Sequence, residues 1–135
     1  MESIKKTGPL VLLLNDDDDE LLDLYSFLDR EGYLVATRIQ PLDACKYACE
    51  RKPEIIVVGG RLAAPQCRAI VQQIQAVSPE SRLLVVRSED DSFALSDLAA
   101  DPHVTVFREF SRNDYFWEKM GEILRRISRP ISLSA

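Results

Sequence analysis

Five short runs of leucine and β-branched residues, separated by helical patterns, constrain the fold of this chain most strongly. The runs are Leu10–Leu14, Tyr33–Thr37, Ile55–Val58, Leu83–Val86 and Val104–Phe107. Four of them are nearly continuous apolar segments without polar alternation, which is typical of strands that are covered on both faces. The second run is weaker, and this favours a strand at the edge of the sheet.

Between the runs, apolar residues recur at helical spacing. The predicted helical faces are Leu21, Leu24, Tyr25 and Leu28; Leu42, Cys45 and Cys49; Ile70, Val71, Ile74 and Val77; Phe93, Leu95 and Leu98; and Phe116, Met120, Ile123, Leu124 and Ile127. Gly32 ends the first helix, Pro41 begins the second, and Ser111 is predicted as the N-cap of the last, with Asp114 at N3. Five βα units joined by right-handed crossovers predict a doubly wound α/β fold with a five-stranded parallel sheet.

Length and composition predict one domain over residues 1–135, with its core at about 9–128 and short tails. The net charge of −5 argues against binding to nucleic acid phosphates or to an anionic membrane surface. No apolar stretch approaches the ~20 residues that span a bilayer, and the N-terminus does not fit a signal peptide. The three cysteines, Cys45, Cys49 and Cys67, lack framework spacing, so we expect a reducing cytoplasm and apolar core positions for them.

Ligands of such sheets bind beyond the carboxyl ends of the strands, so the residues that follow each run are the candidate site. They are Asn15, Asp16, Asp17 and Asp18 after the first run, Gly59, Gly60 and Arg61 after the third, Arg87 and Ser88 after the fourth, and Arg108 and Glu109 after the fifth.

Three segments, in this order and spacing, resemble a known family. They are "VLLLNDDDDELLDLYSFLDREGYLVAT", "RKPEIIVVGGRLAAPQCRAIVQQIQAVSPESRLLVV" and "VTVFREFSRNDYFWEKMGEILRRI". Together they resemble the CheY-like receiver domain of response regulators over nearly the whole chain. The resemblance implies the strand order 2-1-3-4-5. It also implies phosphoryl transfer from a histidine kinase to an aspartate that ends the third strand, with Mg²⁺ held by an acidic pair after the first.

Carried onto this chain, the family's acceptor position falls on Gly59, which has no side chain to phosphorylate. Helix periodicity favours Asp16 and Asp17 as the acidic pair, whereas counting back from Gly32 favours Asn15 and Asp16. Both alternatives stay open. Mg²⁺ prefers near-octahedral oxygen ligands, so the loss of one carboxylate predicts at most a weak site at Asp16 and Asp17.

The remaining positions of the family also depart from its pattern. Its Ser or Thr falls on Arg87, with Ser88 one residue away, and its Lys-Pro pair falls on Arg108 and Glu109. Arginine keeps the positive charge of lysine but not its compact ammonium group. We predict that Arg87 or Arg108 pairs with one of the two aspartates and occupies the former metal pocket.

The acidic run also has a structural interpretation, because aspartates at an N-cap and first turn bind free backbone N–H groups. Gly59 and Gly60 are interpreted as a tight turn, and His103 as a turn residue before the fifth run. The adjacent aromatics Tyr115, Phe116 and Trp117 cannot all face one core, so the start of the last helix is a candidate partner surface.

Three functions follow from these observations. The first is a degenerate receiver that signals by binding a protein: a histidine kinase, an output protein or another receiver, or a second copy through the last helix face. The second is a phosphorylatable receiver that uses Asp16 or Asp17 with Mg²⁺. The third is a small phosphatase, because Asp16 and Asp18 have the Asp-x-Asp spacing of haloacid-dehalogenase-type enzymes. Glu20 stands where those enzymes have threonine, and we expect a non-enzyme.

Overall fold

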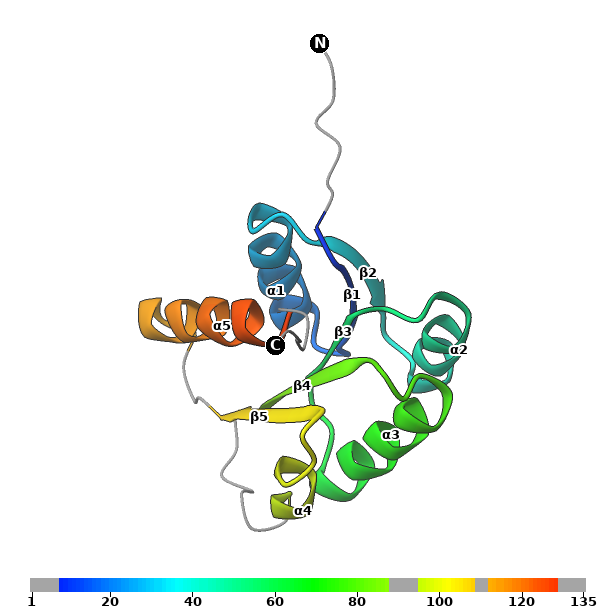
Figure 1. Ribbon diagram of the computed structural model, residues 1–135. Coiled ribbons are helices and arrows are strands. Elements are labelled where there is room, and N and C mark those ends of the chain that lie inside the picture. Colours follow the sequence, from blue (N-terminus) through cyan, green and yellow to red (C-terminus); the bar gives the residue numbers. More distant parts are fainter. Residues whose placement is uncertain (1–7, 88–94, 109–111, 129–135) are drawn as a thin grey trace, which may run out of the picture.

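Five parallel strands form one sheet in the order β2-β1-β3-β4-β5, as the family resemblance implied. The computed structural model describes residues 8–87, 95–108 and 112–128. Its strands are β1 Leu10–Leu14, β2 Leu34–Arg38, β3 Ile55–Val58, β4 Arg82–Arg87 and β5 Val104–Arg108. Its helices are α1 Asp18–Arg30, α2 Pro41–Arg51, α3 Ala64–Val77, α4 Ser96–Ala99 and α5 Asp114–Ile127. The predicted α/β fold is confirmed, with strand ends within one residue of the predicted ones (Figure 1).

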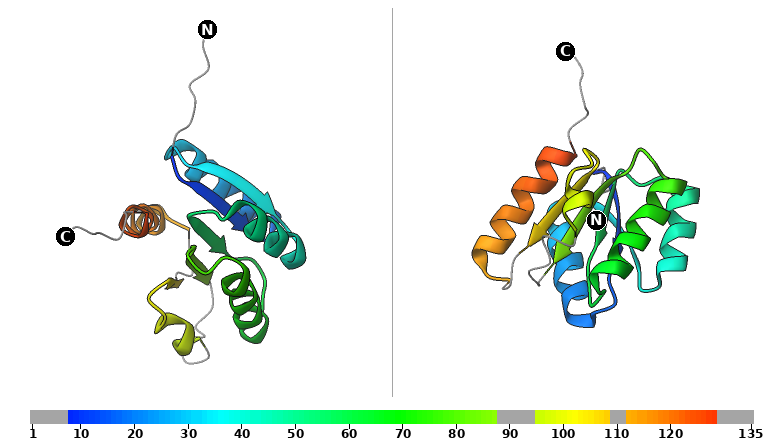
Figure 2. Two further views of the ribbon diagram at one scale, coloured as in Figure 1. Left: turned by 45° about the vertical axis from the view of Figure 1, so that its right-hand side comes forward. Right: turned by 90° about the horizontal axis from the view of Figure 1, so that it is seen from below.

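Helices cover both faces of the sheet (Figures 1 and 2). α1 and α5 lie on one face, and α2, α3 and α4 lie on the other. Val11 and Leu13 of β1 belong to the core cluster under α1 and α5, whereas Leu12 and Leu14 belong to the cluster on the opposite face. Both faces of β1 are therefore buried, and this explains why its sequence shows no polar alternation.

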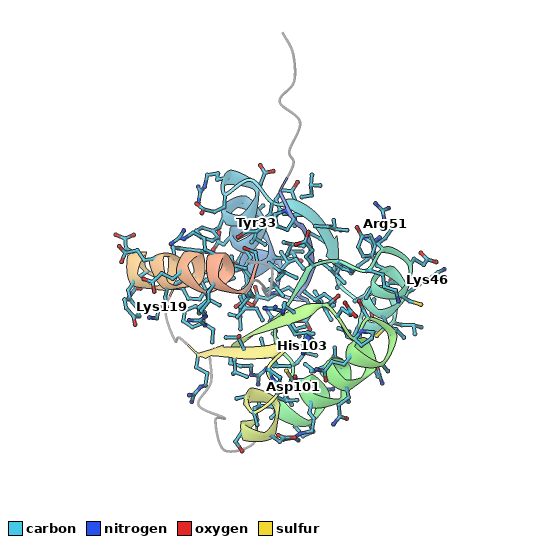
Figure 3. All side chains as sticks on the ribbon, in the orientation of Figure 1. Tyr33, Lys46, Arg51, Asp101, His103 and Lys119 are labelled. Atoms are coloured by element: carbon cyan, nitrogen blue, oxygen red, sulfur yellow. The ribbon has the colours of Figure 1, made fainter. Side chains whose placement is uncertain are left out.

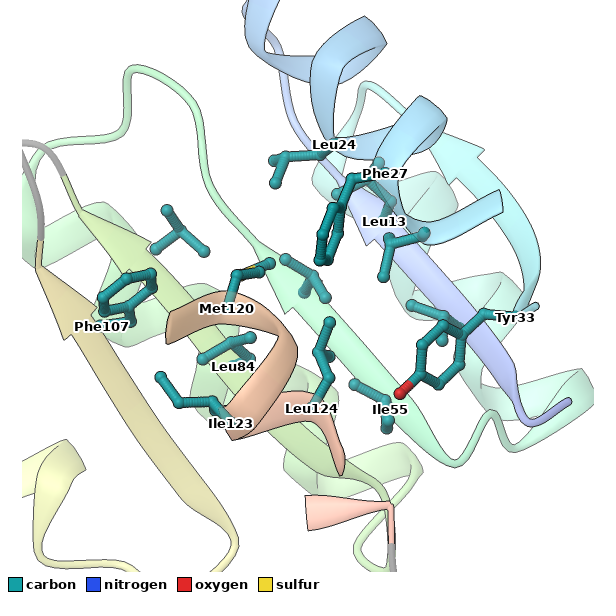
Figure 4. Close-up of a cluster of buried hydrophobic side chains, with 14 of the residues drawn as sticks. Leu13, Leu24, Phe27, Tyr33, Ile55, Leu84, Phe107, Met120, Ile123 and Leu124 are labelled. Atoms are coloured by element: carbon teal, nitrogen blue, oxygen red, sulfur yellow. The ribbon is translucent and has the colours of Figure 1, made fainter. Parts of the chain in front are cut away.

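The core under α1 and α5 joins these helices to four strands of the sheet. Figure 4 shows it as Leu24 and Phe27 from α1, Met120, Ile123 and Leu124 from α5, and Leu13, Ile55, Leu84 and Phe107 from β1, β3, β4 and β5. All five residues of the apolar stripe predicted for the last helix are buried, so this prediction is confirmed. The stripe fixes α5 beside α1.

The start of α5 differs from the prediction. Its N-cap is Asn113, whose side-chain oxygen accepts the Phe116 N–H at 3.0 Å, so Asp114 is the first helical residue. The predicted N-cap, Ser111, was wrong and lies outside the described residues. Serine and asparagine are both favoured N-caps, and the sequence does not say which of two neighbouring candidates begins the helix.

The predicted buried face of α2 was also wrong. Leu42 is 81% exposed and Cys49 is exposed, whereas Ala44 and Ala48 are fully buried. Small alanines let α2 approach the sheet and α3 closely, and a search for large apolar residues overlooks them. Of the three cysteines, Cys67 fills the predicted core position, Cys45 is half-buried against the same core cluster, and Cys49 is exposed.

A change of the α5 cap tests the assigned helix start. We predict that Asn113→Ala lowers the free energy of unfolding by about 1 kcal/mol, because the Phe116 N–H loses its acceptor. Asn113→Asp keeps an acceptor oxygen and serves as the matched control, with little loss. Urea unfolding measures both variants, and equal stability of the two would contradict the cap.

Candidate functional site

The loop of residues 59–63, which joins β3 to α3, lies beside the residues that follow β1. Leu14 and Val58 are register partners at the ends of their strands. The Gly59 N–H donates to the Leu14 carbonyl at 2.9 Å, so strand pairing continues one residue further. The acidic run after β1 therefore faces the glycine pair after β3, at the carboxyl edge of the sheet where the sequence placed the site.

Asn15 organises the turn between β1 and α1. Its side chain is fully buried. Its Oδ1 accepts the Asp17 N–H at 2.8 Å, and its Nδ2 donates to Glu20 Oε1 at 2.6 Å. Both ends of the amide are therefore satisfied within the turn, as a buried polar side chain requires.

Two carboxylates of the acidic run bind the backbone of the facing loop. Glu20 Oε1 accepts the Gly60 N–H at 2.9 Å, and Asp16 Oδ1 accepts the Arg61 N–H at 2.8 Å. Hydrogen bonds to ionised acceptors are stronger than those between neutral groups. Residues 60 and 61 are thus held by charged side chains from the turn after β1 and from α1.

Arg87 binds the next residue of the same loop. Its side chain extends from the end of β4 and is only 4% exposed, and its Nη1 donates to the Leu62 carbonyl at 2.7 Å. Asp16, Glu20 and Arg87 therefore bind three consecutive loop residues, at positions 60, 61 and 62. We call this set of three side chains and their bonds the loop clasp.

Asp17 is the N-cap of α1 and also forms an ion pair. Its Oδ1 accepts the Glu20 N–H at 3.1 Å, and its Oδ2 lies 3.3 Å from Arg61 Nε. The Glu20 N–H and then the Arg61 guanidinium hold the pKa of Asp17 below its usual value. The ion pair described at Asp17 is thus made by Arg61 rather than by the predicted Arg87 or Arg108. Arg61 is 76% exposed, so the pair contributes little to stability.

Gly59, the predicted acceptor position, has no side chain, and two polar side chains lie close to the space beside it. A Cβ atom added to Gly59 would lie 2.9 Å from both Asn15 Nδ2 and Glu20 Oε1. Contacts this short require one of the partners to move. Glu20 therefore places a carboxylate beside the position from which an acceptor side chain would extend.

The other predicted residues lie at the end of β5, on α5 or outside the described part of the chain. Arg108 is exposed at the end of β5 and is the register partner of Arg87. Ser88 and Glu109 are outside the described residues. On α5, Tyr115 is 55% exposed, Phe116 is buried and Trp117 is half-buried, so at least one aromatic faces outward, as predicted.

The residues present do not fit the Mg²⁺ site that the fold family implies. Asp16 accepts a backbone N–H, Asp17 caps a helix and pairs with Arg61, and Gly59 offers no side-chain ligand. Within the described ranges, no group of three or more His, Cys, Asp or Glu side chains is arranged to hold a metal ion. The acidic run serves the helix start and the loop clasp.

Glu20 is the site residue that the sequence analysis did not assign, and for Arg61, which was a candidate, the pairing with Asp17 was not predicted. Glu20 was interpreted as a first-turn acid, and it does follow the N-cap by three residues, at the N3 position of α1. In a capping box the N3 carboxylate turns back to the N-cap N–H. Here it crosses to Gly60 instead, a contact between residues forty positions apart that local spacing does not reveal.

Solved structures of receiver domains have the same fold as this chain. The chemotaxis response regulator CheY4 of Vibrio cholerae is 17% identical, with a TM-score of 0.71 over 90% of this chain and 99% of that chain. The signal receiver domain of an HD domain-containing protein from Pseudomonas fluorescens Pf-5 is 12% identical, with a TM-score of 0.74 over 94% and 90% of the two chains. No protein-family model matches the sequence.

Sequence comparison points the same way. The transcriptional regulatory protein PrrA of Mycobacterium tuberculosis is 29% identical over 101 residues, which are 73% of this chain and 43% of PrrA. The chain thus matches less than half the length of this relative. It has the fold of CheY-like response-regulator receiver domains, and the resemblance predicted from its sequence is confirmed.

Two glycine substitutions test the close packing of the loop against Asp16. Gly60 has φ +98°, and a Cβ there would lie 2.9 Å from the Asp16 backbone nitrogen. We predict that Gly60→Ala lowers the free energy of unfolding by about 1–3 kcal/mol.

Gly121→Ala in α5 is the matched control. Its Cβ would meet the flexible end of Arg125 at 3.2 Å, so we expect no loss and a gain of up to ~1 kcal/mol from helix propensity. Denaturant unfolding measures the free energy of unfolding of both variants. A harmless Gly60→Ala would contradict the described loop.

Proposed function

We propose that this chain is a degenerate receiver of a two-component or phosphorelay system that acts as a non-phosphorylated protein-interaction module. The observation that carries the proposal is the replacement of the acceptor carboxylate by Gly59, with Asn15 and Glu20 in the adjoining space. The similarity to the response-regulator fold supports the signalling class. The proposal that the chain is not phosphorylated rests on Gly59 and its neighbours.

The loop clasp supports a pocket with one stable arrangement. Hydrogen bonds to charged groups contribute on the order of 1.5–3 kcal/mol each when they are buried, and less when they are exposed. A covalent phosphoryl group could shift the equilibrium between two conformations only by interacting differently with each. In this chain the described pocket has no acceptor at the position that the family uses. Protein contact or expression level would then control the signal.

We propose protein partners of the kind that receivers use: a histidine kinase, an output protein or another receiver. A homodimer through the last helix face is a further proposal, supported by the exposed Tyr115. The net charge of −5 supports a proposal of no nucleic acid partner. In the part of the chain that the structure describes, no helix is long and apolar enough to cross a membrane. A cytoplasmic location is proposed from the cysteine pattern.

Phosphorylation of Asp16 or Asp17 is less well supported, because each carboxylate already binds a backbone N–H group. We propose that Mg²⁺ binds weakly at most, since the former ligands hold the loop and the start of α1. We also propose that the chain is not an enzyme. The Asp16 and Asp18 pair of the phosphatase hypothesis has one member in the loop clasp and the other exposed in the first turn of α1.

Treatment with a small-molecule phosphodonor tests the proposed function. The chain is incubated with acetyl phosphate and Mg²⁺, and its whole mass is then measured under conditions that preserve acyl phosphates. We predict no gain in mass, because Gly59 offers no nucleophile. A receiver with an aspartate at this position is the positive control.

A gain of one phosphoryl group, abolished by Asp16→Asn or Asp17→Asn, would instead establish the atypical acceptor.

A further inference from the structure

A groove of about 660 Å³ runs between α1 and α5, away from the loop clasp. Its aromatic part is formed by Phe27 of α1 and Trp117 of α5, whose ring centroids are 4.9 Å apart. Gly121, one helical turn after Trp117, also lines the groove, and a Cβ atom there would lie 3.2 Å from Arg125 Nη1 and 3.7 Å from the Phe27 ring. Two ion pairs lie between the helices: Arg112, which precedes α5, is 3.5 Å from Asp23 of α1, and Arg125 of α5 is 3.8 Å from Glu31, the C-cap of α1.

The rim of the groove is strongly acidic. Four of its eight lining residues are carboxylates and one is a guanidinium, which leaves a formal charge of −3. One row along α5 is formed by Asp114, Glu118 and Glu122. Successive members are four residues apart, which is a rise of ~6 Å along the helix. Glu122 lies 3.6 Å from Lys119. Asp114 and Glu118 form no ion pair with any residue that the structure describes.

Charges of both signs lie on the opposite side of the molecule, where α2 carries Asp43 and Glu50 as well as basic residues. Lys46 and Arg51 lie on α2, on the opposite face of the sheet from α5 (Figure 3). A ring face attracts cations, most strongly in tryptophan, and nearby carboxylates add to that attraction. Trp117 and its acidic neighbours therefore present a cation-selective surface with an apolar component.

We propose that this groove docks a basic segment of a partner protein. Its cationic side chains are about 6 Å apart and face Asp114 and Glu118, and one of them lies over the ring of Trp117. A spacing of ~6 Å matches arginines four residues apart on a helix. The charge complementarity selects this occupant over an acidic or purely apolar one. The inference does not depend on whether the chain can be phosphorylated.

The test uses the full chain and a helical, alanine-rich peptide that carries three arginines four residues apart. Trp117 is the only tryptophan, so its fluorescence reports on the groove directly. We expect a saturable change that weakens with added salt, and none with the peptide in which glutamates replace the arginines. No saturable change with the arginine peptide would overturn the proposal.

Charge variants separate the groove from net charge. Asp114→Asn with Glu118→Gln is expected to weaken peptide binding roughly 3–10-fold, since two facing carboxylates are lost. Asp43→Asn with Glu50→Gln removes the same charge from exposed positions on α2 and is expected to leave binding within about twofold. Equal weakening by the two pairs would show nonspecific attraction and overturn the site.

A filling variant and the oligomeric state complete the test. Gly121→Gln adds a side chain to the lining of the groove, beside Phe27 and Arg125, and is expected to abolish the fluorescence change, while thermal unfolding shows that the variant is folded. Unchanged binding by folded Gly121→Gln would overturn the proposed location. Sedimentation, recorded beside the fluorescence, reports whether a dimer forms at the concentrations used. A dimer whose formation alone changes Trp117 emission would make a second copy the occupant and overturn the basic segment.

Discussion

The hydrogen bonds from the loop after β3 to Asp16 and Glu20 are the interaction on which the pocket depends. They connect the ends of β1 and β3 and the start of α1, and Arg87 adds a bond from the end of β4. Glu20 has two roles, because the same oxygen that binds Gly60 also accepts from the buried Asn15 amide. A run of acids that could be taken for a cation site is here an anchor for backbone N–H groups.

The glycines after β3 are a condition for this arrangement. A side chain at position 59 would meet Asn15 and Glu20, and one at position 60 would meet Asp16. The absence of side chains at positions 59 and 60 and the close approach of the acidic side chains therefore depend on each other.

The fold was readable from the sequence because strands buried on both faces leave continuous apolar runs, as in β1 and β3. The buried face of α2 was not predicted correctly, since it is formed by Ala44 and Ala48, which are too small to stand out as an apolar stripe. At the site, the position of Gly59 followed from family spacing, whereas the partner of Asp17 did not. That partner, Arg61, depends on how two loops approach each other, which local sequence does not encode.

Residue-resolved amide spectra, recorded as Mg²⁺ and then beryllofluoride are added, test the loss of the phosphoryl switch most directly. Gly60 and Arg61 donate to Glu20 and Asp16, so their N–H signals respond to any ion that takes these carboxylates. We predict no saturable shift at either residue up to millimolar Mg²⁺, and no further change with beryllofluoride. A saturable shift of both signals with Mg²⁺, enlarged by beryllofluoride, would show a working receiver pocket and contradict the central claim.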